Sequence, residues 1–253
     1  MNRRLKRSNR ANPREDRNLH DRNDKNLRSN IIELEQFSKK YKKNVDIIPR
    51  NINQETYLEK LEDPSVDIVF AIGPAGTGKS LLGTLYAIQC LKAGLVQKIV
   101  ITRPNIAVDD KDIGYLPGDI YSKMAPWTRP ILEIFEDYYP VKMIESMIEN
   151  NVIELLPMAY LRGRTLKNSV IILDEAQNTT PTSMVSALTR IGDGSKMIVT
   201  GDTRQSDRST HNGLTDFLHR YTHSSRVAVI EFAPTDVERH PVIGTILKWY
   251  NQE

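Results

Sequence analysis

One segment of the chain combines glycines, a lysine and a hydroxyl at a spacing that suits phosphate chemistry. It matches the pattern G-x-x-x-x-G-K-[ST] and reads Gly73-Pro74-Ala75-Gly76-Thr77-Gly78-Lys79-Ser80. The glycines let backbone N–H groups turn toward phosphate oxygens, Lys79 can reach the β- and γ-phosphates, and the Ser80 hydroxyl can bind Mg²⁺. An apolar run precedes the segment and a helical pattern follows it from Leu81, so Gly73 to Leu81 are predicted to bind a nucleoside triphosphate.

Two adjacent carboxylates follow another apolar run, at Asp174 and Glu175. A doubly wound sheet presents its chemistry at the carboxyl ends of its strands. Asp174 is expected to hold Mg²⁺ through water. Glu175 is placed to orient or deprotonate an attacking water, which a hydrolase needs and a phosphotransferase does not. The pair therefore favours ATP hydrolysis.

A third polar segment, Gly201-Asp202-Thr203-Arg204-Gln205, follows a further apolar run. A glutamine at the end of a strand beside the Asp174 strand can hydrogen-bond the γ-phosphate or the attacking water. Gln205 is therefore a candidate catalytic residue. An ordinary strand-to-loop turn is the alternative interpretation of Gly201-Asp202.

The elements that must position these residues are six apolar, β-branched runs separated by helical stretches. Runs of this kind are typical of a parallel sheet that helices cover on both faces, so the fold class predicted is a doubly wound α/β domain. Helices are expected over 31–43, over 54–62, after the phosphate loop and from Thr180-Pro181, with a helical insertion over 119–150. A single domain over 31–253 is predicted. The runs are Asp67 to Ile72, Lys98 to Thr102, Val152 to Leu156, Ser169 to Leu173, Lys196 to Thr200 and Arg226 to Phe232.

Charge is concentrated at the N-terminus. Residues 1–30 hold ten Lys/Arg and four Asp/Glu, a net charge of +6, whereas the rest of the chain carries −3. With few large apolar residues, this arm is expected to be disordered and to attract RNA or DNA without sequence preference. A solvated arm without a partner is the alternative.

Composition excludes several protein classes. No apolar run approaches the roughly 18 residues of a membrane helix, and the basic N-terminus leads into no signal-peptide pattern, so a cytoplasmic protein is expected. A single cysteine, Cys90, excludes an intramolecular disulfide and every Cys₃ or Cys₄ zinc site.

Several short motifs occur in one order and together resemble the PhoH-like family of phosphate-starvation-inducible ATPases over residues 45–250. The resemblance implies a RecA-type P-loop NTPase core akin to one half of a superfamily 1 helicase, with ATP and Mg²⁺ as cofactors. It also implies that Asn53-Gln54 and Tyr57 form the segment that reads and stacks on adenine. The motifs are Gly73 to Ser80, Arg103-Pro104, Leu116-Pro117-Gly118-Asp119, Arg162-Gly163-Arg164-Thr165, Asp174 to Asn178, Gly201-Asp202 with Gln205, and Asp236-Val237 with Arg239-His240.

The leading hypothesis is a Mg²⁺-dependent ATPase coupled to RNA or single-stranded DNA. An arginine from a neighbouring subunit would stabilise the γ-phosphate in the transition state, which predicts a homo-oligomer such as a hexameric ring. Arg239 is the first candidate for this catalytic arginine. The other candidates are Arg103, Arg162, Arg164 and Arg204.

Two alternatives come from other functional classes. A thymidine-kinase-like phosphotransferase also pairs a GKS loop with a DEAQ strand end, although its usual zinc ribbon needs four cysteines. A non-catalytic nucleotide switch would not need both Glu175 and Gln205.

Overall fold

The computed structural model of this chain describes residues 44–104, 120–205, 212–238 and 242, and the side chains of 120–126 are not described. The basic arm, the helix expected over 31–43 and the candidate Arg239 lie outside the described residues. Within the described part, no helix is long and apolar enough to cross a membrane.

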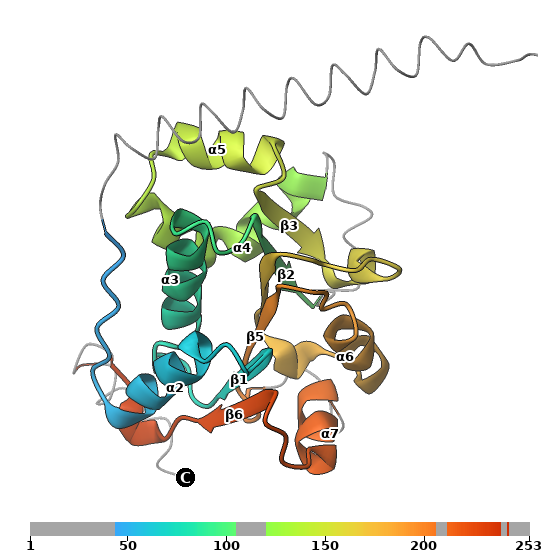
Figure 1. The fold of residues 1–253 in the computed structure, drawn as a ribbon. Coiled ribbons are helices and arrows are strands. Elements are labelled where there is room, and N and C mark those ends of the chain that lie inside the picture. The colour runs from blue at the N-terminus through green and yellow to red at the C-terminus, as the bar shows by residue number, and fades with distance from the viewer. Residues whose placement is uncertain (1–43, 105–119, 206–211, 239–241, 243–253) are drawn as a thin grey trace, which may run out of the picture. The chain divides into compact units, whose positions relative to one another are not determined.

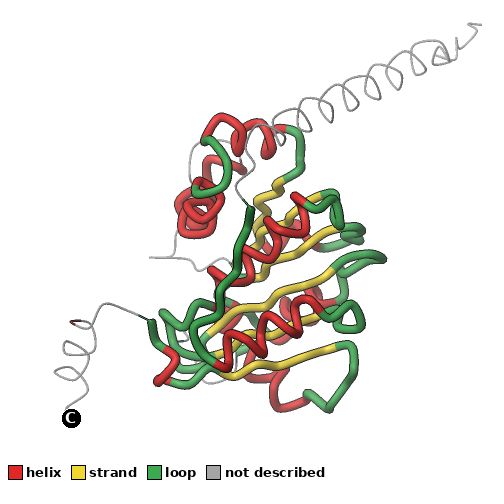
Figure 2. Tube along the Cα trace, turned by 60° about the vertical axis from the view of Figure 1, so that its left-hand side comes forward, coloured by secondary structure: helices red, strands yellow, loops and turns green. Residues whose placement is uncertain are grey.

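The described strands form one six-stranded sheet in the order β3-β2-β4-β5-β1-β6 (Figure 1). Every strand pairing in it is parallel, and each strand coincides with one of the six apolar runs, so the doubly wound α/β prediction is confirmed. Figure 2 shows the strands side by side with helices packed against them. The strands are β1 (Ile68–Ile72), β2 (Lys98–Arg103), β3 (Ile153–Pro157), β4 (Ser169–Leu173), β5 (Lys196–Gly201) and β6 (Val227–Glu231).

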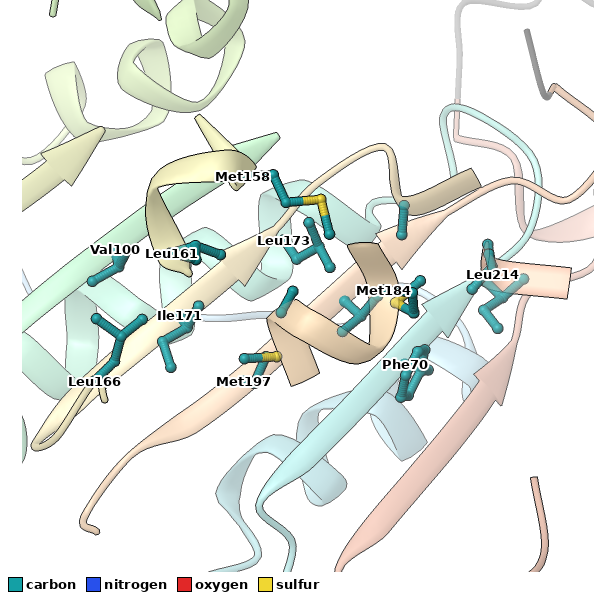
Figure 3. Close-up of a cluster of buried hydrophobic side chains, with 14 residues drawn as sticks. Phe70, Val100, Met158, Leu161, Leu166, Ile171, Leu173, Met184, Met197 and Leu214 are labelled. Atoms are coloured by element: carbon teal, nitrogen blue, oxygen red, sulfur yellow. The ribbon is translucent and has the colours of Figure 1, made fainter. Parts of the chain in front are cut away.

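Helices cover both faces of this sheet, as its apolar central strands require. On one face α6 and α7 contribute Met184 and Leu214 to a buried cluster that also contains Phe70 and Met197 (Figure 3). On the other face α3 lies close to β5. Gly83 permits this approach, since a Cβ at its position would lie only 3.1 Å from the Ile198 side chain. The helices are α2 (Ile52–Glu62), α3 (Lys79–Lys92), α4 (Ile120–Glu136), α5 (Val141–Glu149), α6 (Pro181–Leu188) and α7 (Gly213–Arg220).

Helix boundaries follow local signals in the sequence. Thr180 caps α6 through a capping box with Ser183, and Pro181 occupies the first turn. The predicted insertion contains α4 and α5. The helix expected from Gln54 begins two residues earlier, because the Asn51 side chain accepts a hydrogen bond from the Gln54 N–H and caps α2 there.

The strand order determines where polar residues meet. Strand β5 lies between β1 and β4, and the register pairs Ile72 with Gly201 and Leu173 with Val199. The phosphate loop after β1, the carboxylates after β4 and the polar segment after β5 therefore leave the same edge of the sheet. This is the RecA-like arrangement that the resemblance implies.

Candidate nucleotide-binding site

The phosphate loop joins β1 to α3 and depends on its glycines. Gly73 has φ +144, and a Cβ at this position would lie 2.4 Å from the Phe232 carbonyl oxygen after β6. Gly78 has φ +85 and ends the loop directly before α3 begins at Lys79. The N-terminal end of α3 thus opens onto the loop, and its partial positive charge favours the binding of phosphate there.

The Lys79 side chain is buried against this loop. Its Nζ donates hydrogen bonds to the carbonyl oxygens of Gly73 at 2.7 Å and Pro74 at 2.6 Å. It also lies 3.2 Å from the Thr77 hydroxyl. These neutral acceptors hold the ammonium where the motif predicts a phosphate partner.

Three elements meet at the Asp174 carboxylate. The Ser80 hydroxyl from α3 donates to Asp174 Oδ1 at 2.9 Å, and the Thr200 hydroxyl from β5 donates to the same oxygen. A hydroxyl and a carboxylate are the hard oxygen donors that Mg²⁺ prefers, with phosphates and water completing its shell. The described residues contain no cluster of three or more His, Cys, Asp or Glu able to hold a metal ion alone. Ser80 and Asp174 therefore fit a magnesium ion that arrives with a nucleotide.

Glu175 has a constrained backbone and a carboxylate held on two sides. Its φ of +57 lies in the left-handed region, which costs a non-glycine residue about 1–3 kcal/mol. Arg103 Nη2 lies 2.7 Å from Oε1, and Gln177 Nε2 donates to Oε2. The Gln177 Oε1 in turn accepts a hydrogen bond from the Asp202 N–H at 3.0 Å. The carboxylate is thereby tied to the ends of both β2 and β5.

A cavity of about 260 Å³ brings these groups together. Residues of the phosphate loop, both carboxylates and Gln205 line it, so most of the predicted site residues surround one cavity. Gln205 follows β5 with an exposed side chain, and its N–H donates to the Asp202 carbonyl at 3.2 Å. The lining residues are Ala75, Gly76, Gly78, Lys79, Ser80, Leu81, Asp174, Glu175, Thr200, Gly201, Asp202 and Gln205.

Gln54 borders the phosphate loop from α2. Its side chain is 4% exposed; Nε2 donates to the Thr77 carbonyl at 3.1 Å, and Oε1 accepts from the Arg50 N–H at 2.8 Å. The amide thus joins α2 to the loop. The expected contact between this amide and adenine stays a prediction.

Tyr57 lies deeper than the resemblance implies. Its side chain is 0% exposed, the ring packs edge-on against Phe232, and the hydroxyl lies 3.4 Å from the Lys79 carbonyl. Burial, with a smaller contribution from the Asp174 charge, raises the pKa of Tyr57. A ring enclosed on both faces cannot stack on adenine. The stacking expectation is therefore corrected to a packing role between α2 and α3.

The segment after β6 also reaches the loop. The Asn53 amide donates to Asp236 Oδ2 at 2.7 Å, and the Glu238 N–H donates to the Gly76 carbonyl at 2.9 Å. The Asp236-Val237 motif is thus placed beside the start of α2 and the phosphate loop.

The candidate arginines separate into distinct environments. Arg103 pairs with Glu175, whereas Arg164 pairs with Glu154 at 2.7 Å, and Arg204 is exposed after β5. Arg162 lines a second cavity of about 510 Å³. The other residues lining that cavity are Pro104, Met158, Ala159, Asn178, Thr180, Thr182, Ser183 and Ser186.

Sequence reasoning missed three contributors to the site. The sequence alone assigns no role to Thr200 or Gln177, and it offers Arg103 only as a candidate arginine acting across subunits. The signal for Gln177 is its place two residues after Glu175, within a motif already noted. The Arg103 and Thr200 contacts have no signal within a single segment, because they depend on strand order.

Comparison with known proteins identifies the family. A family model described as PhoH-like protein matches residues 46–251. The PhoH-like protein of Bacillus subtilis (strain 168) is 38% identical over 230 residues, which cover 87% of this chain and 71% of that relative. Protein PhoH of Escherichia coli (strain K12) is 36% identical over 209 residues, which cover 81% of this chain and 58% of that protein.

A solved structure shows weaker similarity. The Pyrococcus furiosus Hef helicase domain aligns with a TM-score of 0.44 and 12% sequence identity, covering 75% of this chain and 39% of that one. This chain thus spans only part of the length of the proteins it matches. The match of the PhoH-like family model to most of the sequence, together with relatives at this identity, shows that the chain belongs to the PhoH-like family.

Proposed function

We propose that this chain is a Mg²⁺-dependent ATPase of the PhoH-like type, coupled to RNA or single-stranded DNA. The observation that carries the proposal is the contact between the Ser80 hydroxyl and Asp174, 2.9 Å apart, in one cavity with Lys79 and Glu175. A phosphate cradle, a set of magnesium ligands and a second carboxylate are the parts that phosphoryl transfer to water requires.

The chain's own residues divide the work in the proposed reaction. The loop N–H groups and Lys79 bind the β- and γ-phosphates, and Ser80 with Asp174 would hold Mg²⁺, which supplies neutralisation of phosphate charge. Glu175 accepts a proton from the attacking water while the water oxygen forms a bond to the γ-phosphorus. The bond between the γ-phosphorus and the β,γ-bridging oxygen breaks, which leaves ADP and inorganic phosphate. Gln205, which lines the same cavity, would hydrogen-bond the γ-phosphate or the water.

One experiment separates this proposal from its two alternatives. The purified chain is incubated with γ-labelled ATP, Mg²⁺ and thymidine, and the labelled products are resolved. We expect the label in inorganic phosphate. Label in thymidine monophosphate would support the phosphotransferase, and label remaining in ATP with and without RNA would support a nucleotide switch.

The nucleic-acid part of the proposal is supported by charge and by the second cavity. Residues 1–30 carry +6 on a chain whose remainder is negative. Arg162 lines the second cavity together with the hydroxyl residues Thr180, Thr182, Ser183 and Ser186. A cationic group beside hydroxyl donors can contact a phosphodiester backbone.

Deleting residues 1–30 should weaken RNA binding and flatten its salt dependence, while basal ATP turnover stays the same. Each phosphate contact contributes about 0.7 to the slope of log affinity against log salt for single strands. A matched variant keeps the arm's length and replaces its ten Lys/Arg with Gln; it should behave like the deletion. An unchanged slope in both variants would show that the arm only extends into solvent.

Gln54→Ala should reduce the preference for ATP over GTP by roughly ten- to a hundredfold, because an amide can match both the donor and the acceptor on the adenine edge. Removing Gln54 also frees α2 from the loop, but that change affects both nucleotides alike. Competition binding of ATP against GTP to the wild type and the variant isolates the base contact. Equal preference in the two proteins would leave Gln54 with its structural role alone.

The proposed assembly is a homo-oligomer, such as a hexameric ring, in which Arg239 or another candidate arginine reaches a neighbouring site. Light scattering in the presence of ATP and Mg²⁺ tests this part of the proposal. A molar mass equal to one 28.9 kDa chain would contradict it.

A further inference from the structure

One guanidinium at the end of β2 contacts a carbonyl in α4 and the two adjacent carboxylates that follow β4. Arg103 Nη1 donates to the Trp127 carbonyl in α4 at 2.7 Å, and Nη2 lies 2.7 Å from Glu175 Oε1. Its Nε lies 4.0 Å from Asp174 Oδ2. The Arg103 side chain is 23% exposed, so these contacts are partly shielded from water. Arg103 thus joins the insertion to both carboxylates of the candidate site.

The position of the Glu175 carboxylate depends on a few directional contacts. Its side chain is 37% exposed and projects from a left-handed backbone position that few residues adopt. Arg103 and Gln177 each donate to a different oxygen of the carboxylate. A carboxylate has about four lone-pair sites, so these two donors still leave acceptor capacity for a water molecule.

We propose that Arg103 is a positioning residue that fixes the Glu175 carboxylate for reaction and is itself anchored by α4. The inference rests on the proposed ATPase function and deepens it. A planar guanidinium presents its N–H groups in a fixed fork, so the direction toward the Trp127 carbonyl sets the direction toward Glu175. The anchor lies in the 119–150 insertion, which gives that insertion a part in catalysis.

The geometry distinguishes this role from an arginine that binds phosphate or acts across subunits. An arginine that contacts Glu175 and α4 within its own chain acts through the base. Its loss should lower kcat and leave ATP binding intact. A phosphate-binding arginine would raise KM, and its effect would not depend on Glu175.

The test compares Arg103→Ala with the wild type in steady-state ATP turnover. We expect kcat to fall by roughly ten- to a hundredfold, the scale of a misplaced catalytic group, with KM within about threefold. Arg226→Ala is the matched control, because Arg226 forms an exposed ion pair with Asp67, outside the described cavity. Its kcat should stay within about twofold of the wild type. Arg103→Gln replaces Arg103→Ala if thermal unfolding shows that the alanine variant does not fold.

A double-mutant cycle measures whether the effect of Arg103 on kcat depends on Glu175, which a merely structural role of Arg103 would not require. In a Glu175→Gln background, Arg103→Ala should change the residual turnover by less than about twofold, because the group it positions is already lost. Three results would each overturn the proposal. The kcat losses of the two single variants could multiply in the double variant, Arg103→Ala alone could keep kcat within twofold of the wild type, or Arg103→Ala could raise KM and retain kcat. Absence of ATP turnover in the wild type would instead contradict the proposed ATPase function, so failure of that function and failure of the positioning role give different results.

Discussion

Replacing Glu175 with glutamine should lower ATP turnover by about a hundred- to ten-thousandfold, the range over which general base catalysis contributes. The amide keeps the size of the side chain and can still accept from Arg103, but it cannot take the proton of the attacking water. ATP affinity should stay within about threefold of the wild type, because the phosphate contacts belong to the loop and to Lys79. Phosphate release and equilibrium binding, measured on the same preparation, check both parts.

The matched control is Glu145→Gln, which makes the same chemical change on an exposed face of α5. Its turnover should equal that of the wild type. A Glu175→Gln variant that hydrolyses ATP at the wild-type rate would show that Glu175 does not handle the water.

Replacing Lys79 with methionine should weaken triphosphate binding by roughly a hundred- to a few thousandfold. Breaking a buried pair by removing one charge costs about 3–5 kcal/mol, and each 1.4 kcal/mol is a factor of ten in affinity. Methionine fills similar space but offers no donor to the phosphate oxygens or to the Gly73 and Pro74 carbonyls. Titration with ATP in the presence of Mg²⁺ measures the loss.

Lys142→Met, an exposed position in the first turn of α5, is the control for removing a positive charge. It should bind ATP like the wild type. Wild-type ATP affinity in Lys79→Met would contradict the assignment of Gly73 to Leu81 as the phosphate site.

The sheet could be predicted because its central strands are buried on both faces. β4 is buried at all five positions, and such a run of apolar β-branched residues is readable without any neighbour. The phosphate loop was equally readable, since its function depends on residues adjacent in sequence. Asp174, Glu175 and Gln205 follow from their places at strand ends, and the structure brings all three to the same cavity.

The rest depends on which strands are neighbours. The contact between Arg103 and Glu175 requires β2 to lie beside β4, and the Thr200 contact with Asp174 requires β5 on the other side. The role of Tyr57 could not be predicted from the sequence for a different reason. Its spacing from Gln54 is compatible with a shared site, but side-chain burial against Phe232 decides its role, and burial is a tertiary property.

Phosphate release from ATP by the purified chain, with excess Mg²⁺ and again with EDTA, tests the central claim most directly. We expect turnover with Mg²⁺, an increase of this turnover with RNA or single-stranded DNA, and no turnover with EDTA or in Lys79→Met. Phosphate release that persists in EDTA, or release in Mg²⁺ and nucleic acid no faster than that of Lys79→Met, would contradict it.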